Sequence, residues 1–207
     1  MQNNIVSIFD VPVNNLTMSE TLSVVTNSIK SKSKIHHTVI NVGKVVAMQK
    51  DQQLKESVIN ADLINADGAG IILAAKLFGT PLKERVTGID LMEKLVEVAH
   101  QNKFKIFFFG AKEEIVRKVV ESYSEKYSPN IVAGYRNGYF DKKDEQNIAK
   151  SIADSGANIL FVAITSPKKE NFLFENKKTL NSVNFTMGVG GSFDVVSGKV
   201  KRAPIWM

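Results

Sequence analysis

The chain has 207 residues, of which 43% are hydrophobic and 23% are charged, a composition typical of a globular protein and not of a disordered or fibrous one. It has no cysteine, and its three histidines lack the spacing of a metalloprotease helix, so we expect no disulfide, no metal site and no obligatory metal cofactor. The formal net charge of +6 favours an anionic partner, which could be nucleic acid, a phosphorylated small molecule or an acidic membrane face.

The N-terminal sequence MQNNIVSIFDVPVNN has neither a basic n-region nor an apolar h-region, and no window approaches the roughly 20 apolar residues of a membrane-spanning helix. These features predict a cytoplasmic protein. No linker rich in Pro, Gly or Ser divides the chain, and no sequence repeat is found. We therefore expect residues 1–207 to form a single domain, with a short β segment over residues 4–13 packed to one side.

Apolar periodicity predicts the secondary structure in chain order. Residues 17–20 read T-M-S-E, a capping box, and the apolar spacing after it predicts a helix over 18–31. Five units follow, each a short apolar strand that leads directly into a helical pattern. Their strands and helices are predicted at 36–42 and 45–49, 61–67 and 68–79, 103–110 and 111–127, 130–135 and 141–155, and 157–164 and 167–180. A last strand over 184–190 ends in glycines.

Strands that alternate with helices predict parallel βαβ units with right-handed crossovers. The continuous apolar runs FFF (107–109) and ILFVAI (159–164) are typical of strands buried on both faces. The predicted fold class is therefore α/β, a Rossmann-like, mostly parallel sheet with helices on both faces.

Ligands of open parallel sheets bind beyond the carboxyl ends of the strands, where the N-termini of helices also point. The residues at the predicted strand ends are therefore the candidate site. They are Asn41, Gly43, Asp67, Gly68, Gly70, Gly110, Thr165, Ser166, Pro167, Lys168, Gly188, Gly190 and Gly191.

Asp67 is the candidate that carries chemistry. An Asp-Gly pair between a strand and a helix is usually a turn and helix cap, and that interpretation stays open. A carboxylate in a partly dehydrated cleft, however, can have a raised pKa and act as a general base on a hydroxyl. Gly68 and Gly70 would let a ligand approach the backbone closely.

Other motifs restrict the class of ligand that the site could bind. The glycines of MGVGGSFD (187–194) form either a phosphate or ribose cradle or a plain turn. The chain contains neither GxGxxG after the first strand nor GxxxxGK[ST], which disfavours dinucleotide redox chemistry and P-loop hydrolysis. It also has no Asp-x-Asp pair, so helix N-termini and basic side chains are expected to neutralise a bound diphosphate.

Two lysines begin the helix in SPKKENFL (166–173). The simplest interpretation is a solvated, capped helix start. Because lysines at a helix N-terminus oppose the helix dipole, Lys168 and Lys169 also suggest an anionic neighbour. The pair His36 and His37 is interpreted as part of a strand and not as a ligand or base.

The succession of motifs INVGKVVAMQKD, INADGAGIILAAKLFG, ERVTGIDL, SPKKE and GVGGSFDVVSGKVKRAPIWM resembles the WecG/TagA/CpsF glycosyltransferase family from about residue 35 to the last residue. The resemblance implies an inverting transfer of a hexose-type sugar, an N-acetylated amino sugar or a uronic acid, from a UDP-sugar to a polyprenyl-diphosphate-linked saccharide at the inner face of the bacterial membrane. Such steps build teichoic acid linkage units, enterobacterial common antigen, capsules or exopolysaccharide. The resemblance further implies peripheral binding to the cytoplasmic membrane surface and a homo-oligomer.

The resemblance also assigns roles to residues. Asp67 matches the proposed general base of the family, Asn41 its pocket asparagine, and Arg85 an arginine near the acceptor diphosphate. Gly190, Gly191 and Asp194 look like elements on the nucleotide side. The remaining predicted substrate-binding residues are Lys169 and the residues already placed at strand ends: Gly68, Gly110, Thr165, Ser166 and Lys168.

The chain departs from the family pattern at two positions. It has Val39 where the family commonly has Thr, and Lys169 where the family commonly has Gln. Lys only donates hydrogen bonds and carries a full charge, whereas Gln donates and accepts. Our hypothesis is that Lys169 meets a carboxylate or a diphosphate oxygen, as a uronic acid donor would provide; the alternative is a weakened or inactive member.

Relatives in this family continue beyond RAPIWM into an Arg-rich C-terminal segment that helps to bind the membrane, so we expect the chain to lack that segment. Two other functions stay open at this point. One is a non-catalytic sugar-nucleotide-binding or scaffold protein of a polysaccharide assembly complex. The other, a nucleic-acid-binding protein, is disfavoured because the lysines are dispersed and not clustered with aromatic residues.

Overall fold

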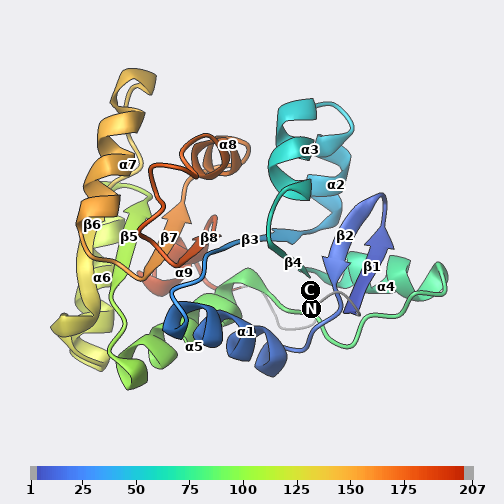
Figure 1. The fold of residues 1–207 in the computed structure, drawn as a ribbon, viewed down its shortest axis with the longest axis horizontal. Helices are drawn as coiled ribbons and strands as arrows, with labels where there is room; N and C mark the ends of the chain where they lie inside the picture. The colour runs from blue at the N-terminus through green and yellow to red at the C-terminus, as the bar shows by residue number, and fades with distance from the viewer. Residues whose placement is uncertain (1–3, 203–207) are drawn as a thin grey trace.

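The computed structural model describes residues 4–202, which form an α/β fold around a parallel sheet (Figure 1). Six strands pair in the order β4-β3-β8-β7-β5-β6, and each pair is parallel. Their bounds are β3 Ile35–Ile40, β4 Leu63–Ala66, β5 Ile106–Gly110, β6 Val132–Arg136, β7 Ile159–Ala163 and β8 Phe185–Gly188. The predicted fold class is confirmed.

Helices connect the strands and cover both faces of the sheet. Their bounds are α1 Met18–Lys30, α2 Val42–Met48, α3 Gln52–Ile59, α4 Ala69–Leu77, α5 Gly88–Asn102, α6 Glu113–Lys126, α7 Glu145–Asp154, α8 Lys168–Glu175 and α9 Ser192–Val196. The capping box predicted at the start of α1 is present, since Thr17 and Glu20 each bond the backbone N–H of the other. Within the described residues no helix has both the length and the apolar character needed to cross a membrane.

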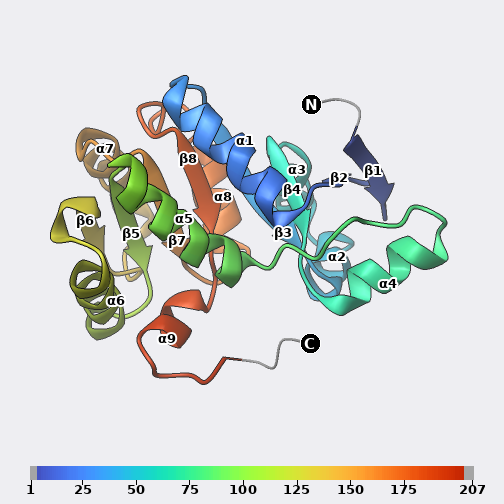
Figure 2. The same cartoon turned by 90° about the horizontal axis from the view of Figure 1, so that it is seen from below.

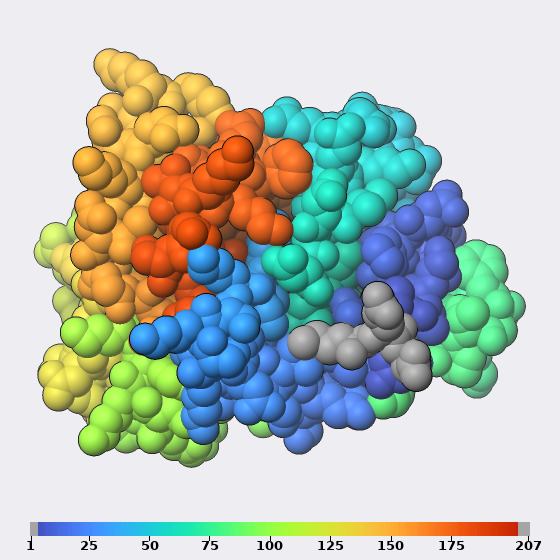
Figure 3. Space-filling model, viewed as in Figure 1, coloured from blue at the N-terminus to red at the C-terminus, as the bar shows by residue number. Residues whose placement is uncertain are grey.

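β5 contains an uninterrupted run of apolar residues because both faces of this strand are buried. Phe108 packs against α1, α5 and α6 on one face, while Phe107 and Phe109 pack against α7 and α8 on the other. Because successive side chains of a strand point to opposite faces, both faces need apolar residues. α3 lies beside α8, where Gln53 donates to Glu175 over 2.8 Å, and their cyan and orange surfaces meet in Figure 3.

The predicted N-terminal β segment is a hairpin of two antiparallel strands, β1 Ile5–Ile8 and β2 Val11–Asn14. It packs beside β4, the edge strand of the main sheet, where Asn14 Oδ1 accepts the backbone N–H of Ile64 over 2.8 Å. The hairpin, α2, α3 and α4 together form an apolar cluster at this end of the molecule, in addition to the apolar clusters on the two faces of β5. An edge strand with unpaired backbone groups is thereby covered.

Three helices were not predicted: α3, α5 and α9. The longest of them, α5, follows Thr87, whose side chain accepts the backbone N–H of Asp90 over 3.3 Å. Its Leu91, Leu95 and Ala99 are fully buried at helical spacing. The cap and the period are both legible in the sequence, so this helix was a missed prediction and not a departure from the pattern.

Two adjacent histidines are buried on β3, the strand next to the edge strand β4. His37 is fully buried and places Nε2 2.9 Å from Asn65 Oδ1. Burial lowers the pKa of His36 to about 4, against the opposing charge of Asp62, and lowers the pKa of His37 to about 3. Both imidazoles are therefore neutral in the folded protein at neutral pH, and the interpretation of the pair as strand residues is confirmed.

We predict that acid destabilises the fold through these histidines. Their folded pKa values lie below the unfolded value of about 6.5, so the unfolded state binds more protons as the pH falls from there toward 4. At pH 5 each histidine should lower the free energy of unfolding by about 2 kcal/mol relative to its value at pH 7.5. Urea unfolding at the two pH values measures this fall in unfolding free energy. The fall should be smaller in His36→Gln and unchanged in the control His100→Gln, because the side chain of His100 is exposed.

A second stability prediction concerns Gly110, which has a φ of +128° at the end of β5. A Cβ there would lie 2.3 Å from the backbone oxygen of Ala163. Gly110→Ala should therefore lose about 3 kcal/mol or more of unfolding free energy. Gly43→Ala is the matched control, because its Cβ would meet only Asn41 Oδ1, at an ordinary contact distance of 3.5 Å, and the change lies in α2, so it should be neutral or stabilising by about 1 kcal/mol. Equal unfolding midpoints for the two variants would contradict the prediction.

Candidate active site

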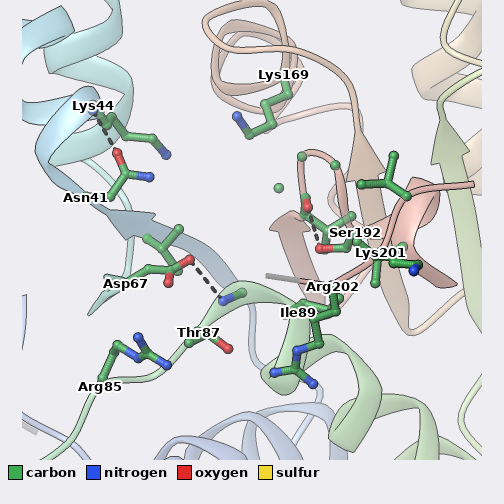
Figure 4. A pocket seen from close by; sticks show the side chains of 18 residues that line it. Asn41, Lys44, Asp67, Arg85, Thr87, Ile89, Lys169, Ser192, Lys201 and Arg202 are labelled. Carbon is green, nitrogen blue, oxygen red and sulfur yellow. Dashed lines mark hydrogen bonds between the residues drawn. The ribbon is translucent and has the colours of Figure 1, made fainter. Parts of the chain in front are cut away.

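Two cavities open at the carboxyl edge of the sheet. The first, the Asp67 cavity, has a volume of about 540 Å³ and lies between the ends of β3, β4 and β8 and the start of α5 (Figure 4). The second, the Asp194 cavity, has a volume of about 770 Å³ and lies at the ends of β5 and β7. Lys169, Gly190 and Gly191 line both. The loop from β8 to α9 therefore forms a wall common to the two cavities.

The carboxylate of Asp67 lines the first cavity, directly after β4. Its Oδ2 accepts the backbone N–H of Gly88 over 3.2 Å, the contact drawn in Figure 4. Oδ1 has no hydrogen-bond donor among residues 4–202. Burial raises the pKa of Asp67, and the bond from Gly88 and the charges of Arg85 and Lys44 oppose the rise without cancelling it. The side chain thus combines a structural bond with a carboxylate oxygen that is available to a ligand.

Asn41 lies on the same side of the cavity as this carboxylate, at the end of β3, which pairs with β4 (Figure 4). It is the N-cap of α2, and its Oδ1 accepts the backbone N–H of Lys44 over 2.8 Å. With the oxygen held in the cap, the amide nitrogen lies on the cavity side in Figure 4. The geometry makes Asn41 a hydrogen-bond donor to whatever occupies the cavity.

A buried cluster of three charges forms part of the cavity wall, with Lys44 and Lys169 among the lining residues. The Nζ atoms of Lys44 and Lys169 lie 2.9 and 2.7 Å from the same oxygen, Oε1 of Glu170, and all three residues are at least nine-tenths buried. Lys44 Nζ also donates to Thr38 Oγ1 over 3.2 Å. Burial raises the pKa of Glu170, but the charges of Lys44 and Lys169 outweigh it and hold the pKa at about 2. Burial lowers the pKa of Lys44, against the opposing charge of Glu170; with both lysines protonated, one carboxylate against two ammonium groups leaves the cluster with a net positive charge.

Lys169 thus has a carboxylate partner within the chain, which the sequence hypothesis did not include. Its side chain passes beside Gly188, where a Cβ would lie 3.0 Å from Lys169 Cδ and Cε. Gly188 therefore makes room for the lysine stem.

The segment after α9 closes the Asp67 cavity from the other side. Val200, Lys201 and Arg202 line it, and the guanidinium of Arg202 forms an ion pair with Asp90 in the first turn of α5. Hydrogen bonds from Thr87 and Arg202 lower the pKa of Asp90, although burial raises it. Basic residues consequently surround the cavity on several sides, as an anionic occupant requires.

The Asp194 cavity combines aromatic, hydroxyl and charged groups. Tyr139 and Phe140 line it together with Thr165 and Ser166. Lys168 Nζ lies 3.7 Å from the centroid of the Phe140 ring. The remaining charged residues on its wall are Lys112, Lys169, Asp194 and Lys199, of which Asp194 and Lys199 pair over 3.1 Å.

The structure brings most of the predicted site residues to the one edge where they were expected, but divides them between two cavities. The Asp67 cavity holds Asn41, Asp67, Arg85, Lys169, Gly190 and Gly191, and the Asp194 cavity holds Thr165, Ser166, Lys168 and Asp194 besides the three shared residues. Gly68 and Gly110 line neither. Gly68 starts α4 with a φ of +100°, and Gly110 permits the close approach to Ala163, so a backbone requirement explains both glycines.

Sequence reasoning missed several residues of these walls. Lys44 and Glu170 meet only because α2 and α8 pack over adjacent parts of the sheet, and no local pattern indicates this. Tyr139 and Arg202 lie in segments without periodicity. Among the described residues, no group of three or more His, Asp or Glu side chains is placed to hold a metal ion.

Comparisons with known proteins bear on the whole of this edge. A family model described as "Glycosyl transferase WecG/TagA/CpsF family" matches residues 6–207. Three proteins that are each named N-acetylglucosaminyldiphosphoundecaprenol N-acetyl-beta-D-mannosaminyltransferase are similar to the chain. The one from Bacillus subtilis (strain 168) is 37% identical over 171 residues, which cover 82% of this chain and 65% of that protein.

The relative from Bacillus spizizenii is 38% identical over 70% of this chain and 55% of its own length. The relative from Staphylococcus aureus (strain NCTC 8325) is 31% identical over 96% of this chain and 78% of its own length. The chain thus spans less than two thirds of the two Bacillus relatives. Its match to the family model nevertheless extends through both cavities, up to residues outside the described range, and the chain belongs to the WecG/TagA/CpsF glycosyltransferase family.

Proposed function

We propose that this protein is an inverting glycosyltransferase that moves a sugar from a UDP-sugar to a polyprenyl-diphosphate-linked saccharide in the synthesis of a bacterial cell-surface polymer. The observation that carries the proposal is the Asp67 carboxylate, which lines a cavity rich in cations and has a raised pKa. The relatives' names describe a transfer to a diphosphoundecaprenol-linked sugar, which agrees with such a cavity.

The two cavities suit the two substrates. We assign the nucleotide of the donor to the Asp194 cavity, where ring faces and hydroxyl groups are available to a base and a ribose. The acceptor diphosphate is assigned to the Asp67 cavity, near Arg85. The sugar to be transferred then lies at the wall that both cavities share, beside Lys169, Gly190 and Gly191.

The reaction is a single in-line displacement at the anomeric carbon of the donor. Asp67 removes the proton of the acceptor hydroxyl as the oxygen attacks, and UDP leaves from the opposite face of the sugar. Backbone amides at helix N-termini and the surrounding lysines stabilise the charge that develops on the leaving diphosphate. Holding both substrates at one wall supplies a large part of the acceleration.

Two classes of donor sugar are candidates, and Lys169 bears on the choice between them. An N-acetylhexosamine fits the names of the relatives, whereas the positive charge of the Lys44, Lys169 and Glu170 cluster favours a sugar that carries a carboxylate. We retain both classes as candidate donors, since the charge would act on a uronic acid and leave a neutral sugar largely unaffected.

Asp67→Asn should abolish transfer while leaving the fold and UDP binding intact. The amide oxygen can still accept the N–H of Gly88, so the structural bond survives, but the base is lost and turnover should fall about 10²- to 10⁴-fold. Thermal stabilisation by UDP reports binding, with ~2.7 kcal/mol expected at 100 times the dissociation constant. Turnover at the wild-type rate in this variant would remove Asp67 from the role of base.

Lys169→Gln should change the choice of donor. Without the second ammonium, Lys44 and Glu170 form a neutral pair, and binding of a UDP-uronic acid should weaken by about tenfold or more relative to wild type. Binding of the matched neutral UDP-N-acetylhexosamine should change little. A thermal-shift screen of paired acidic and neutral UDP-sugars measures both. If wild type and variant prefer the same neutral sugar, the uronic acid donor is wrong.

A further inference from the structure

One carboxylate joins lysines of both cavity walls but lines neither cavity itself. Glu170 is 3% exposed and lies in the first turn of α8. Lys44 lines the Asp67 cavity and Lys169 lines both cavities, whereas Glu170 is absent from the described residues that line them. Any effect of Glu170 on a bound substrate must therefore act through the two lysines.

The strand order brings this cluster together from two helices. α2 follows β3 and α8 follows β7, and β8 pairs with both of these strands. Figure 2 shows α1 and α5 in front of the sheet and α2 and α8 behind it, so α2 and α8 cover the same face. A lysine of α2 and a glutamate of α8 can thus meet at the carboxyl edge of the sheet.

Stability alone does not account for three buried charges at this edge. Removing ionised groups from water is costly, and the contacts of a buried ion pair often do no more than offset that cost. Apolar residues of similar volume would hold the two helices together at least as well. Because the charges lie beside a cavity, we look for their role in what the cavity binds.

Three contacts fix the position of Lys44. Its Nζ lies 2.9 Å from Glu170 Oε1 and donates to Thr38 Oγ1 over 3.2 Å. Its backbone N–H donates to Asn41 Oδ1 over 2.8 Å at the start of α2. Figure 4 shows the ends of the Lys44 and Lys169 side chains turned toward each other at the cavity wall. The ammonium of Lys44 is thereby held in one place before a ligand arrives.

Glu170 also favours the charged form of Lys44. Burial lowers the pKa of Lys44, the charge of Glu170 opposes this fall, and the charge of Lys169 adds to it. If a neutral amide replaced the carboxylate of Glu170, the two largest remaining effects would both favour the neutral amine of Lys44.

The other charged groups near Lys44 do not replace Glu170. Asp67 also attracts Lys44, but it is the single acidic residue among the described residues that line its cavity, and the proposed function needs it as the base. His36 on β3 is neutral at neutral pH. On α3, which packs against α2 and α8, the one acidic residue is Glu56, which is exposed. The other charged residues on the wall of the Asp67 cavity, besides the two lysines of the cluster, are all basic: Arg85, Lys201 and Arg202.

We propose that Glu170 is a positioning residue that acts through Lys44: it holds the Lys44 ammonium at the wall of the Asp67 cavity, where that charge meets the diphosphate of the acceptor. Lys44 then touches the substrate and Glu170 does not. This role rests on the proposed function, which places the acceptor diphosphate in the same cavity.

The first test is a pH titration by NMR of protein with isotope-labelled lysine side chains and no substrate. Lys44→Met identifies the signal of Lys44. In Glu170→Gln, Lys44 should lose its proton at least about one pH unit below its value in wild type. Glu145→Gln is the matched control, because Glu145 is also buried and paired, but its partner Lys142 has a side chain that is 70% exposed. The titration of Lys44 should not change in that variant.

The second test separates KM from kcat in transfer to a water-soluble diphosphate acceptor analogue. KM for the acceptor should rise with pH by about tenfold as Lys44 loses its proton. This rise should begin at least about one pH unit lower in Glu170→Gln than in wild type, with kcat little changed. Glu170→Asp keeps the charge and should keep the pH dependence of wild type. A merely structural role would instead raise KM or lower kcat by one factor at every pH.

The same comparison in a second background isolates the pair of Lys44 and Glu170. Lys169→Gln retains this pair, and Lys169→Gln/Glu170→Gln removes its carboxylate while leaving one buried ammonium and not two. The double variant therefore tests the proposal even where Glu170→Gln alone does not fold. Lys44 should again titrate at least about one pH unit lower in the double variant than in Lys169→Gln.

Two results would overturn the role of Glu170. One is a Lys44 that titrates at the same pH with and without the carboxylate, and the other is an acceptor KM whose dependence on pH is the same in Glu170→Gln and wild type. The lysine titration needs no turnover, so it stands apart from the assay of transfer. Absence of both UDP binding and transfer in wild type would contradict the proposed function instead.

Discussion

One carboxylate shared by two buried lysines holds the carboxyl edge of the sheet together. Glu170 at the start of α8 meets Lys44 of α2 and Lys169 of its own helix, so it joins the ends of β3, β7 and β8. Removing three charges from water is costly, and only the short contacts among them offset that cost. The arrangement cannot lose one member cheaply, because the remaining charges would stay buried without a partner.

The same cluster sets the electrostatics of the cavity in front of it. Burial raises the pKa of Asp67, whereas the hydrogen bond from Gly88 and the charges of Arg85 and Lys44 lower it. The balance keeps a carboxylate in a partly dry cavity while leaving it more basic than an exposed aspartate. A general base needs both properties, since it must be ionised to accept a proton and basic enough to compete for one.

The strands of the sheet could be predicted from the sequence, whereas the two cavities at its edge could not. The apolar periodicity and the alternation of strands with helices predicted the strands; the FFF of β5, for example, is typical of a strand buried on both faces. The N-cap at Thr87 and the apolar periodicity of α5 were also present in the sequence, but this helix was missed. The division into two cavities was beyond reach. It depends on where the loop at Gly190 and Gly191 lies between β8 and α9, and on contacts such as Lys44 with Glu170 that only the strand order creates.

The position of Arg202 links the last described segment to the chemistry of Asp67. Burial is the main cause of the raised pKa of Asp67, the negative charge of Asp90 adds to the rise, and Arg202 pairs with Asp90. The guanidinium therefore offsets a like charge that would otherwise act on the base, and it does so from the segment that closes the cavity wall. In the structure this segment lines the cavity and pairs with Asp90 of α5, so one arginine both contributes to the cavity wall and offsets part of this like charge. The ion pair between Arg202 and Asp90 thus belongs both to the wall of the cavity and to the charges around its central carboxylate.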